Sequence, residues 1–219
     1  LANYKYADQI KWKGQFIFRD KRTVKPEYIE KIKKAGGEEF FVGLETGSDK
    51  IRKEMGKGFT TDDAEYHLEH FSKNRIKVTF LMFPGYVTET IDDHNETLKL
   101  FPRWQKFVAD GTITAMEFGY PLVFLSGTPI ERKIDEWGIK FMNDKPGHWY
   151  STVNPGLDFP ERVRRQCELY ETAIKYKFPI WRFSSRAENL YKSLEYYYDN
   201  ETKIIKSARH IPIAVKLNV

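Results

Sequence analysis

Short segments that carry hydroxyl, carboxylate or guanidinium side chains, three of them together with glycine, follow the expected strands of this sequence. They are Arg19-Asp20, Gly43-Leu44-Glu45-Thr46-Gly47-Ser48, Phe83-Pro84-Gly85-Tyr86 and Leu125-Ser126-Gly127-Thr128-Pro129. Glycine allows close backbone approach, and the polar groups could hold a ribose, a carboxylate or a phosphate. Ordinary turn chemistry explains any one segment alone, with Ser48 as a helix cap and Pro84-Gly85 as a β-turn. Several such segments at the same end of one sheet favour a ligand site.

The elements that would position these segments alternate between strand and helix. Strands are expected at residues 15–18, 39–43, 77–83 and 113–118, and helices are expected to begin at Pro26, Ser48, Thr60 and Thr90. The second strand is apolar almost throughout, which is typical of a strand covered on both faces. Pro102 lies inside the last helical stripe and predicts a kink or a break. This alternation predicts a parallel sheet with right-handed crossovers, whose ligands collect at the carboxyl ends of the strands.

The alternation of strands and helices ends at about residue 145. Turn-rich punctuation at Lys145-Pro146-Gly147 and Asn154-Pro155-Gly156 is followed by capped helices after Asp158 and Ser185, and Ile211–Leu217 could form a final strand. We therefore expect an α/β domain at residues 1–145 and a mainly helical extension at residues 146–219.

Composition restricts the function classes. The net charge of +5 comes from interleaved acidic and basic residues, whereas a nucleic-acid binder more often shows a stripe of one sign. A nucleic-acid partner is therefore disfavoured but stays open. No apolar run reaches the roughly 18 residues that span a bilayer, and no signal peptide is visible, so we expect a cytoplasmic protein. His67 and His70 lie three apart on a helix, but without a third ligand we expect no metal site.

The ordered motifs resemble a known family. GLETGSDKIRKEMGKGFTTDDAEYHLEHF, then IKVTFLMFPGYVTETIDD and later FLSGTPI resemble the latter part of a radical S-adenosylmethionine (SAM) enzyme barrel. The likeness is greatest to the group whose members often carry a cobalamin-binding or tRNA-modifying neighbour domain. It covers roughly residues 15–135 and implies a partial (β/α) barrel of parallel strands with a helical C-terminal extension. It also implies that a [4Fe–4S] cluster in the parent enzyme reductively cleaves SAM to a 5′-deoxyadenosyl radical.

The resemblance also implies site residues. Glu45, Thr46 and Ser48 would contact the ribose and methionine portion of SAM, and Phe83, Pro84 and Gly85 would border the adenine. Ser126 and Gly127 would lie near the substrate mouth, and Arg19 is a weaker candidate for the methionine carboxylate. No residue of this chain is assigned a catalytic role.

The departures from the family pattern concern the cluster. The family holds its cluster with a C-x₃-C-x₂-C triplet after its first strand, and this chain has the single cysteine Cys167. Cys167 lies at an apolar helical position and reads as a small buried hydrophobe. The likeness begins near the third strand of the family barrel, so we expect the first two strand–helix units to be missing. We therefore expect the isolated chain to perform no radical chemistry and to bind SAM weakly.

One alternative function and two expected partners follow from these departures. The chain could instead be an α/β domain that binds a phosphorylated small molecule or a nucleotide at its strand ends, without radical chemistry. The missing N-terminal barrel portion, in the same parent chain or in a separate cysteine-rich chain, is the expected partner. The first strand would be left as a bare edge, which the N-terminal segment, Ile211–Leu217 or self-association with another chain would cover.

Overall fold

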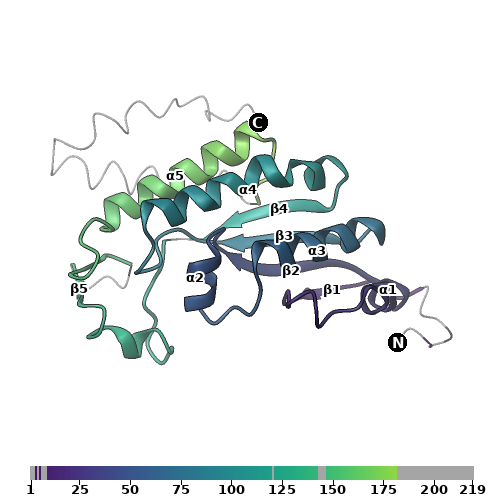
Figure 1. The fold of residues 1–219 in the computed structure, drawn as a ribbon, viewed down its shortest axis with the longest axis horizontal. Coiled ribbons are helices and arrows are strands. Elements are labelled where there is room, and N and C mark those ends of the chain that lie inside the picture. Colours follow the sequence, from purple (N-terminus) through teal and green to yellow (C-terminus); the bar gives the residue numbers. More distant parts are fainter. Residues whose placement is uncertain (1–2, 4, 6–8, 120, 143–146, 182–219) are drawn as a thin grey trace.

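A sheet of four parallel strands in the order β1-β2-β3-β4 forms the centre of the computed structural model, which describes residues 3, 5, 9–119, 121–142 and 147–181 (Figure 1). The strands are β1 (Trp12–Gln15), β2 (Gly37–Glu45), β3 (Lys77–Met82) and β4 (Ile113–Phe118). The helices are α1 (Pro26–Lys34), α2 (Asp49–Glu54), α3 (Thr61–Lys73), α4 (Ile91–Ala109) and α5 (Phe159–Lys175). The predicted α/β class with parallel strands is confirmed. No described helix has both the length and the apolar character needed to cross a membrane.

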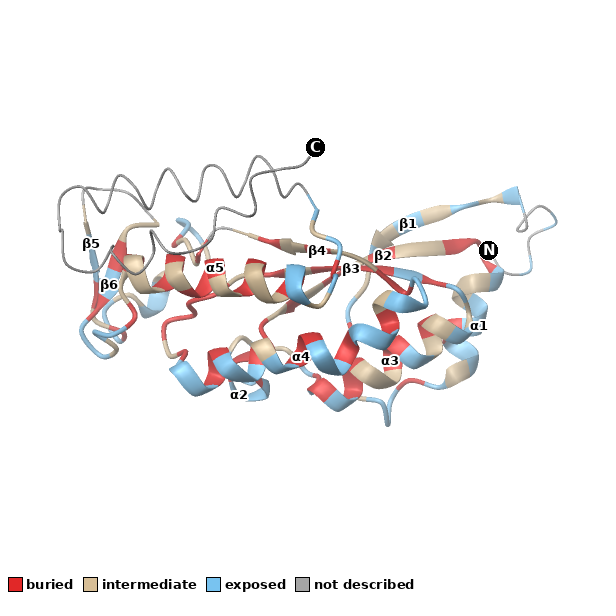
Figure 2. Ribbon diagram, turned by 90° about the horizontal axis from the view of Figure 1, so that it is seen from above, coloured by how far each residue is buried: buried red, intermediate tan, exposed pale blue. Residues whose placement is uncertain are grey.

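The helices α1, α3 and α4 lie against one face of the sheet, and the core lies between these layers (Figure 2). In β2 the side chains of Phe40, Val42 and Leu44 point into this core and are at most 1% exposed. The alternate side chains, including Phe41, are only half-buried, although the ring of Trp181 contacts Phe41 at 5.6 Å between centroids. The two faces of β2 are therefore not buried alike, contrary to the sequence expectation.

Two local expectations need correction. The first strand is Trp12–Gln15 rather than residues 15–18, because Phe18 leaves the sheet and stacks on His67 at 4.6 Å. The apolar run there marks burial rather than strand pairing. The helix α4 continues without a break through Pro102, which lies on the exposed face of the helix. Burial of Phe101, Trp104 and other residues of the same stripe offsets the hydrogen bond that proline cannot make.

The helix α5 packs into the core of the sheet. Val163, Cys167 and Tyr170 belong to the same apolar cluster as the strands, and after α5 the chain pairs with β4 through a parallel bridge between Met116 and Ile180. This helix thus occupies the position of a further crossover. The division of the chain at residue 145 stays a prediction, and the expected elements at Ser185 and Ile211–Leu217 lie outside the described residues. Within the described part β1 pairs with β2 alone, so the expected cover of its outer edge is not tested.

A small insertion separates β4 from α5. It contains the 3₁₀ helix η2 (Glu131–Lys133) and an antiparallel pair formed by β5 (Ile139–Phe141) and β6 (Trp149–Ser151). Its apolar cluster is separate from the main core and includes Trp137 and Trp149. The buried Arg162 of α5 holds the insertion in place, because its guanidinium lies 3.6 Å from the Trp149 ring centroid and donates to the Trp149 carbonyl at 2.6 Å.

Capping boxes fix where α3 and α4 begin. Thr60 with Asp63 caps α3, and Thr90 with Asp93 caps α4, as the sequence predicts. Burial alone would raise the pKa of Asp93, but hydrogen bonds from Thr90, Ser48 and Lys50 outweigh that effect and lower its pKa to about 2. A depressed folded-state pKa contributes stability that is present above the unfolded value of about 3.9 and is lost as the pH falls toward 2.

Replacement of Asp93 by asparagine should therefore destabilise the protein in a pH-dependent way. We expect Asp93→Asn to lower the free energy of unfolding by about 1–2 kcal/mol at pH 7, and this loss should shrink as the pH falls from about 4 toward 2. Urea unfolding at a series of pH values measures it. The exposed neighbour provides the control Asp92→Asn, which should change little. An equal loss at all pH values would contradict the assignment of the charge.

Candidate functional site

The carboxyl end of β2 turns away from the sheet at an unusual backbone conformation. Glu45 has a φ of 66°, in the left-handed region that non-glycine residues seldom occupy, and the pairing of β2 with β3 shifts register between Gly43 and Glu45. The Glu45 carbonyl still accepts a hydrogen bond from the Phe83 amide at 3.0 Å. Strained residues of this kind persist only where their surroundings hold them, and they concentrate at functional sites.

The next residues are joined to α4. The amide of Gly47 donates to the Thr97 hydroxyl at 2.8 Å, and the Thr46 hydroxyl lies 3.0 Å from the same oxygen. The Ser48 hydroxyl donates to Asp93 at 2.7 Å and also caps α2. A Cβ atom on Gly47 would lie 2.4 Å from the Thr97 Cα, so only glycine permits this approach. The loop is therefore a rigid support for Glu45.

The side chain of Glu45 folds back over its own strand and pairs with Lys57. The Lys57 ammonium lies 2.7 Å from Glu45 Oε1 and donates to the Gly43 carbonyl at 3.2 Å. A Cβ atom on Gly43 would meet Glu45 Oε1 at 2.3 Å, which explains glycine at this position. Both charged side chains remain partly exposed, at 21% for Glu45 and 30% for Lys57. They present a carboxylate and an ammonium to the same opening.

The segment after β3 forms a second wall. Gly85 has a φ of 82°, and the Glu89 carboxylate accepts a hydrogen bond from its amide at 3.1 Å. Tyr86 is 6% exposed and its ring meets Trp137 of the insertion edge-on at 5.6 Å. Burial, helped by the nearby carboxylates of the acidic residues Glu54 and Glu136, raises the pKa of the Tyr86 phenol above its usual value.

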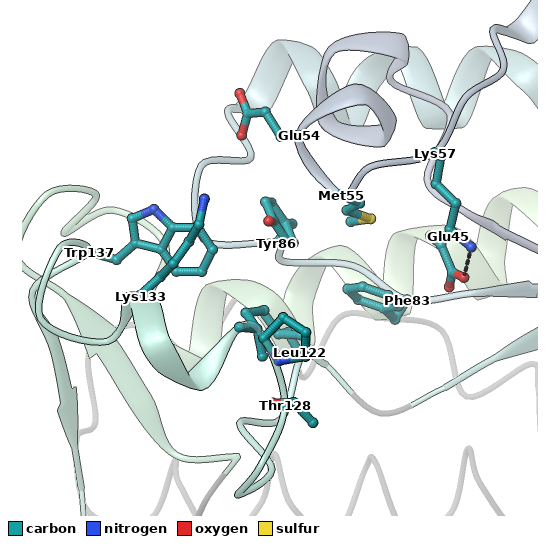
Figure 3. A pocket seen from close by; sticks show the side chains of 12 residues that line it. Glu45, Glu54, Met55, Lys57, Phe83, Tyr86, Leu122, Thr128, Lys133 and Trp137 are labelled. Carbon is teal, nitrogen blue, oxygen red and sulfur yellow. Dashed lines mark hydrogen bonds and ion pairs between the residues drawn. The ribbon is translucent and has the colours of Figure 1, made fainter.

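A cavity of about 360 Å³ opens between these segments and the insertion (Figure 3). Its lining is mostly apolar and carries charges at two places, the Glu45–Lys57 pair at one end and Glu54 with Lys133 at the other. The lining residues are Glu45, Glu54, Met55, Lys57, Phe83, Tyr86, Leu122, Thr128, Pro129, Ile130, Lys133 and Trp137. An apolar cleft with a few convergent polar groups is the usual form of a small-molecule site. This one suits a flat or extended ligand that carries hydroxyl or charged groups.

The structure places the predicted residues in different positions. Glu45 and Phe83 line the cavity. Pro84 and Gly85 follow Phe83 in the same loop but are not among the lining residues. Thr46 and Ser48 are at most 1% exposed, with their hydroxyls engaged toward α4. Their contact with a ligand stays a prediction, and in this structure they support Glu45.

The remaining candidates lie farther from the lining. Ser126 and Gly127 are exposed in the turn just before Thr128, and the Gly127 amide donates to Glu131 at 2.7 Å. Arg19 is exposed after β1, with its amide bonded to His67 at 3.1 Å, and it is not a lining residue. The ligand roles predicted for these three residues are not tested by the geometry. The three turns beginning at Gly43, Pro84 and Ser126 do contribute to one opening, through Glu45, Tyr86 and Thr128.

Sequence reasoning missed the wall that the insertion provides. Trp137, Lys133 and Ile130 line the cavity, yet they lie in a stretch that has no clear strand or helix period. The sequence of this stretch offers one signal, a single tryptophan among charged residues. Its place beside Tyr86 depends on how the insertion folds back, which local sequence does not show.

Residues 14–101 match the family model of the radical SAM superfamily. The chain carries a radical SAM segment. This segment contains the end of β1, all of β2 and β3 and the first part of α4, so it includes both the Glu45 turn and the Gly85 turn of the cavity. The resemblance noted in the sequence is confirmed in this range. Comparison with curated proteins gave no match.

The fold is similar to solved radical SAM enzymes. The cobalamin-dependent radical SAM enzyme OxsB with aqua-cobalamin bound has 18% identity and a TM-score of 0.50, over 87% of this chain and 34% of that one. The methyltransferase TsrM from Kitasatospora setae has 18% identity and a TM-score of 0.43, over 57% of this chain and 25% of that one. Elp3 from Methanocaldococcus infernus has 15% identity and a TM-score of 0.43, over 67% of this chain and 29% of that one. The chain thus spans about a third or less of these proteins, and at such identities the OxsB likeness concerns the fold alone.

The donor set of these residues does not fit an iron–sulfur cluster. Such clusters are held by several thiolates, and this sequence has one cysteine. Cys167 is 3% exposed inside α5, where burial raises the pKa of its thiol to about 12. Within the described part of the chain, no group of three or more His, Cys, Asp or Glu residues could hold a metal ion.

Cys167 should therefore resist thiol reagents in the folded protein. At pH 8 we expect iodoacetamide to modify it at least tenfold more slowly than in the denatured chain, because both burial and the high pKa suppress the thiolate. Intact-mass spectrometry over time, with and without denaturant, measures the two rates. Equal rates would show that α5 does not pack as described.

Proposed function

We propose that this chain forms the nucleoside-binding edge of a radical SAM enzyme, with SAM as its ligand. The observation that carries the proposal is the cavity at the ends of β2 and β3, because one of its walls, which includes Glu45 and Phe83, belongs to the segment that matches the radical SAM family. Parallel α/β sheets place ligands at this end of their strands. The parent enzyme would use a cluster-bound SAM to begin radical chemistry.

The groups that line this end of the cavity suit a ribose and a base. The carboxylate of Glu45 can accept hydrogen bonds from the two hydroxyls of a ribose, and its left-handed backbone aims it toward the opening. The Phe83 ring and the Met55 thioether offer apolar surface to a purine. Lys57 holds Glu45 and adds a cation that can meet a carboxylate of the ligand.

The alternative of a phosphate-binding domain has less support. Helix N-termini are the usual anion sites of such folds, since their free N–H groups and dipole attract phosphate. Here Asp63 and Asp93 already accept hydrogen bonds at the first turns of α3 and α4. A phosphate at either position would meet a carboxylate. The two carboxylates of the cavity lining, Glu45 and Glu54, are balanced by Lys57 and Lys133, so the cavity has no excess of positive charge to attract a polyanion.

Cleavage of SAM needs an electron from a cluster, and these residues do not supply the thiolates for one. We therefore propose that the chain by itself binds the nucleoside weakly and catalyses no radical step. The cluster would come from the N-terminal barrel portion of the same parent chain or from a separate polypeptide. A cluster supplied in this way would provide the electron for cleavage of SAM.

Binding of S-adenosylhomocysteine, which is stable and needs no cluster, tests the proposed ligand. Isothermal titration of the chain should show S-adenosylhomocysteine binding and weaker or no binding of ATP or a sugar phosphate. Glu45→Gln should weaken the affinity about tenfold, because a hydrogen bond to a charged group is lost. Glu38→Gln, at the other end of the same strand, is the matched control and should leave the affinity unchanged. Tighter binding of ATP than of S-adenosylhomocysteine would support the phosphate alternative and reject the proposal.

Anaerobic incubation with iron and sulfide tests the missing thiolates. The chain alone should not gain the broad visible absorption of a [4Fe–4S] cluster, and it should not release 5′-deoxyadenosine from SAM under reducing conditions. Addition of a polypeptide that carries a C-x₃-C-x₂-C segment should be required for both signals. Stoichiometric cluster assembly on the chain alone would contradict this part of the proposal.

A further inference from the structure

We propose that Glu89 is a positioning residue that holds the Gly85 loop, residues 83–88, in the shape that forms one wall of the cavity. Ligand affinity would then depend on a side chain that does not itself line the cavity. The ligand half of this inference rests on the proposed function, whereas the tether between Glu89 and the loop stands on the structure alone.

Glu89 closes the Gly85 loop at two points. Its Oε2 accepts a hydrogen bond from the Gly85 amide at 3.1 Å, and its own amide donates to the Tyr86 carbonyl at 2.8 Å. The side chain is 2% exposed, so water does not compete for the carboxylate. A hydrogen bond from a backbone amide to a buried carboxylate is among the stronger ones in proteins. The three residues between Gly85 and Glu89 are thereby gathered into a compact excursion.

The other oxygen of Glu89 is fixed by α5. Arg165, 5% exposed, donates to Glu89 Oε1 at 2.8 Å and to the carbonyl oxygens of Glu89 and Thr90 at 3.2 Å and 3.1 Å. His94 lies on the same side, with its Nδ1 4.0 Å from Oε1. The two carboxylate oxygens therefore have different tasks. Oε1 anchors the residue to the helix pair, and Oε2 holds the loop.

The tether determines where the cavity wall lies. Phe83 and Tyr86 flank Gly85, and both side chains line the cavity (Figure 3). Gly85 also lies against Arg162, since a Cβ atom there would be 2.4 Å from the Arg162 Cγ, so the loop is blocked in that direction. With Oε2 withdrawn, the Gly85 amide would be buried without a partner and the loop would move to find one. Phe83 and Tyr86 would move with it.

A merely structural role for Glu89 makes a different prediction from a positioning role, and two substitutions separate them. Glu89→Gln keeps the length of the side chain and one acceptor oxygen. With that oxygen on the Gly85 amide, the NH₂ group faces Arg165, so the charge pair is lost while the loop keeps its hydrogen bond. Glu89→Asp keeps that charge but is shorter by one methylene group, so the oxygen that stays with Arg165 leaves Gly85 out of reach. Arg165 also donates to Glu161 at 2.8 Å, a contact that neither substitution removes, and this favours folding of both variants.

Hydrogen exchange measured by mass spectrometry on the 219-residue chain reports the loop directly. We expect Glu89→Asp to speed exchange in the segment 83–89 about tenfold, with β2 and β3 unchanged, and to weaken S-adenosylhomocysteine binding. Glu89→Gln should stay closer to the wild type in both readouts, even though it lowers the unfolding midpoint more. Glu161→Gln removes another carboxylate from Arg165 without touching Gly85 and should leave loop exchange unchanged.

The inference would be overturned if Glu89→Gln loosened the loop as much as Glu89→Asp, because the ranking would then follow the charge pair alone. Wild-type protection of the loop in Glu89→Asp would overturn it as well. A wild-type chain that binds no S-adenosylhomocysteine would reject the proposed function, and the exchange comparison would still decide whether Glu89 holds the loop.

Discussion

The close contact between Gly47 and Thr97 is the constraint on which the candidate site depends. It brings the turn after β2 against the helix that follows β3, so that two crossover units share one edge. Glu45 can hold its left-handed backbone only because the residues after it are bonded to α4 through Thr97 and Asp93. A side chain at position 47 would separate the helix from the turn. The hydroxyl groups of this turn hold it against α4. In the proposed function they would affect a ligand only through the position of Glu45.

The charged groups near the site are also satisfied by partners within the protein. The carboxylates that begin α3 and α4 satisfy the helix N-termini from within, and this removes the anion sites that such termini usually offer. Glu45 and Lys57 neutralise each other at the rim instead of facing a phosphate. The cavity therefore favours a ligand with hydroxyl groups and a mixed charge. The proposed sulfonium nucleoside would have this character.

The helix pair α4–α5 connects the cavity to the rest of the molecule through buried charge. Glu89 and Arg165 pair in the interior, and Arg165 also pairs with Glu161. Arg162, one turn earlier on α5, fills the space beside Gly85 and holds the insertion through Trp149. One face of α5 thus supports both walls of the cavity, the Gly85 loop and the insertion. This arrangement lets residues outside the lining set its shape.

The sequence by itself determined the alternation of strands and helices and the caps at Ser48, Thr60 and Thr90. It also showed that the segment that carries Glu45 and Phe83 resembles the radical SAM superfamily. These features depend on local pattern, because period, capping and glycine turns act over a few residues. Only the tertiary structure decided that the first strand ends at Gln15, that α4 passes through Pro102 and that Thr46 and Ser48 face a helix. It also decided that Trp137 and Lys133 complete the cavity. At these places burial against segments distant in the sequence outweighs the local preference for helix, strand or turn. The local sequence does not show which distant segment will pack there.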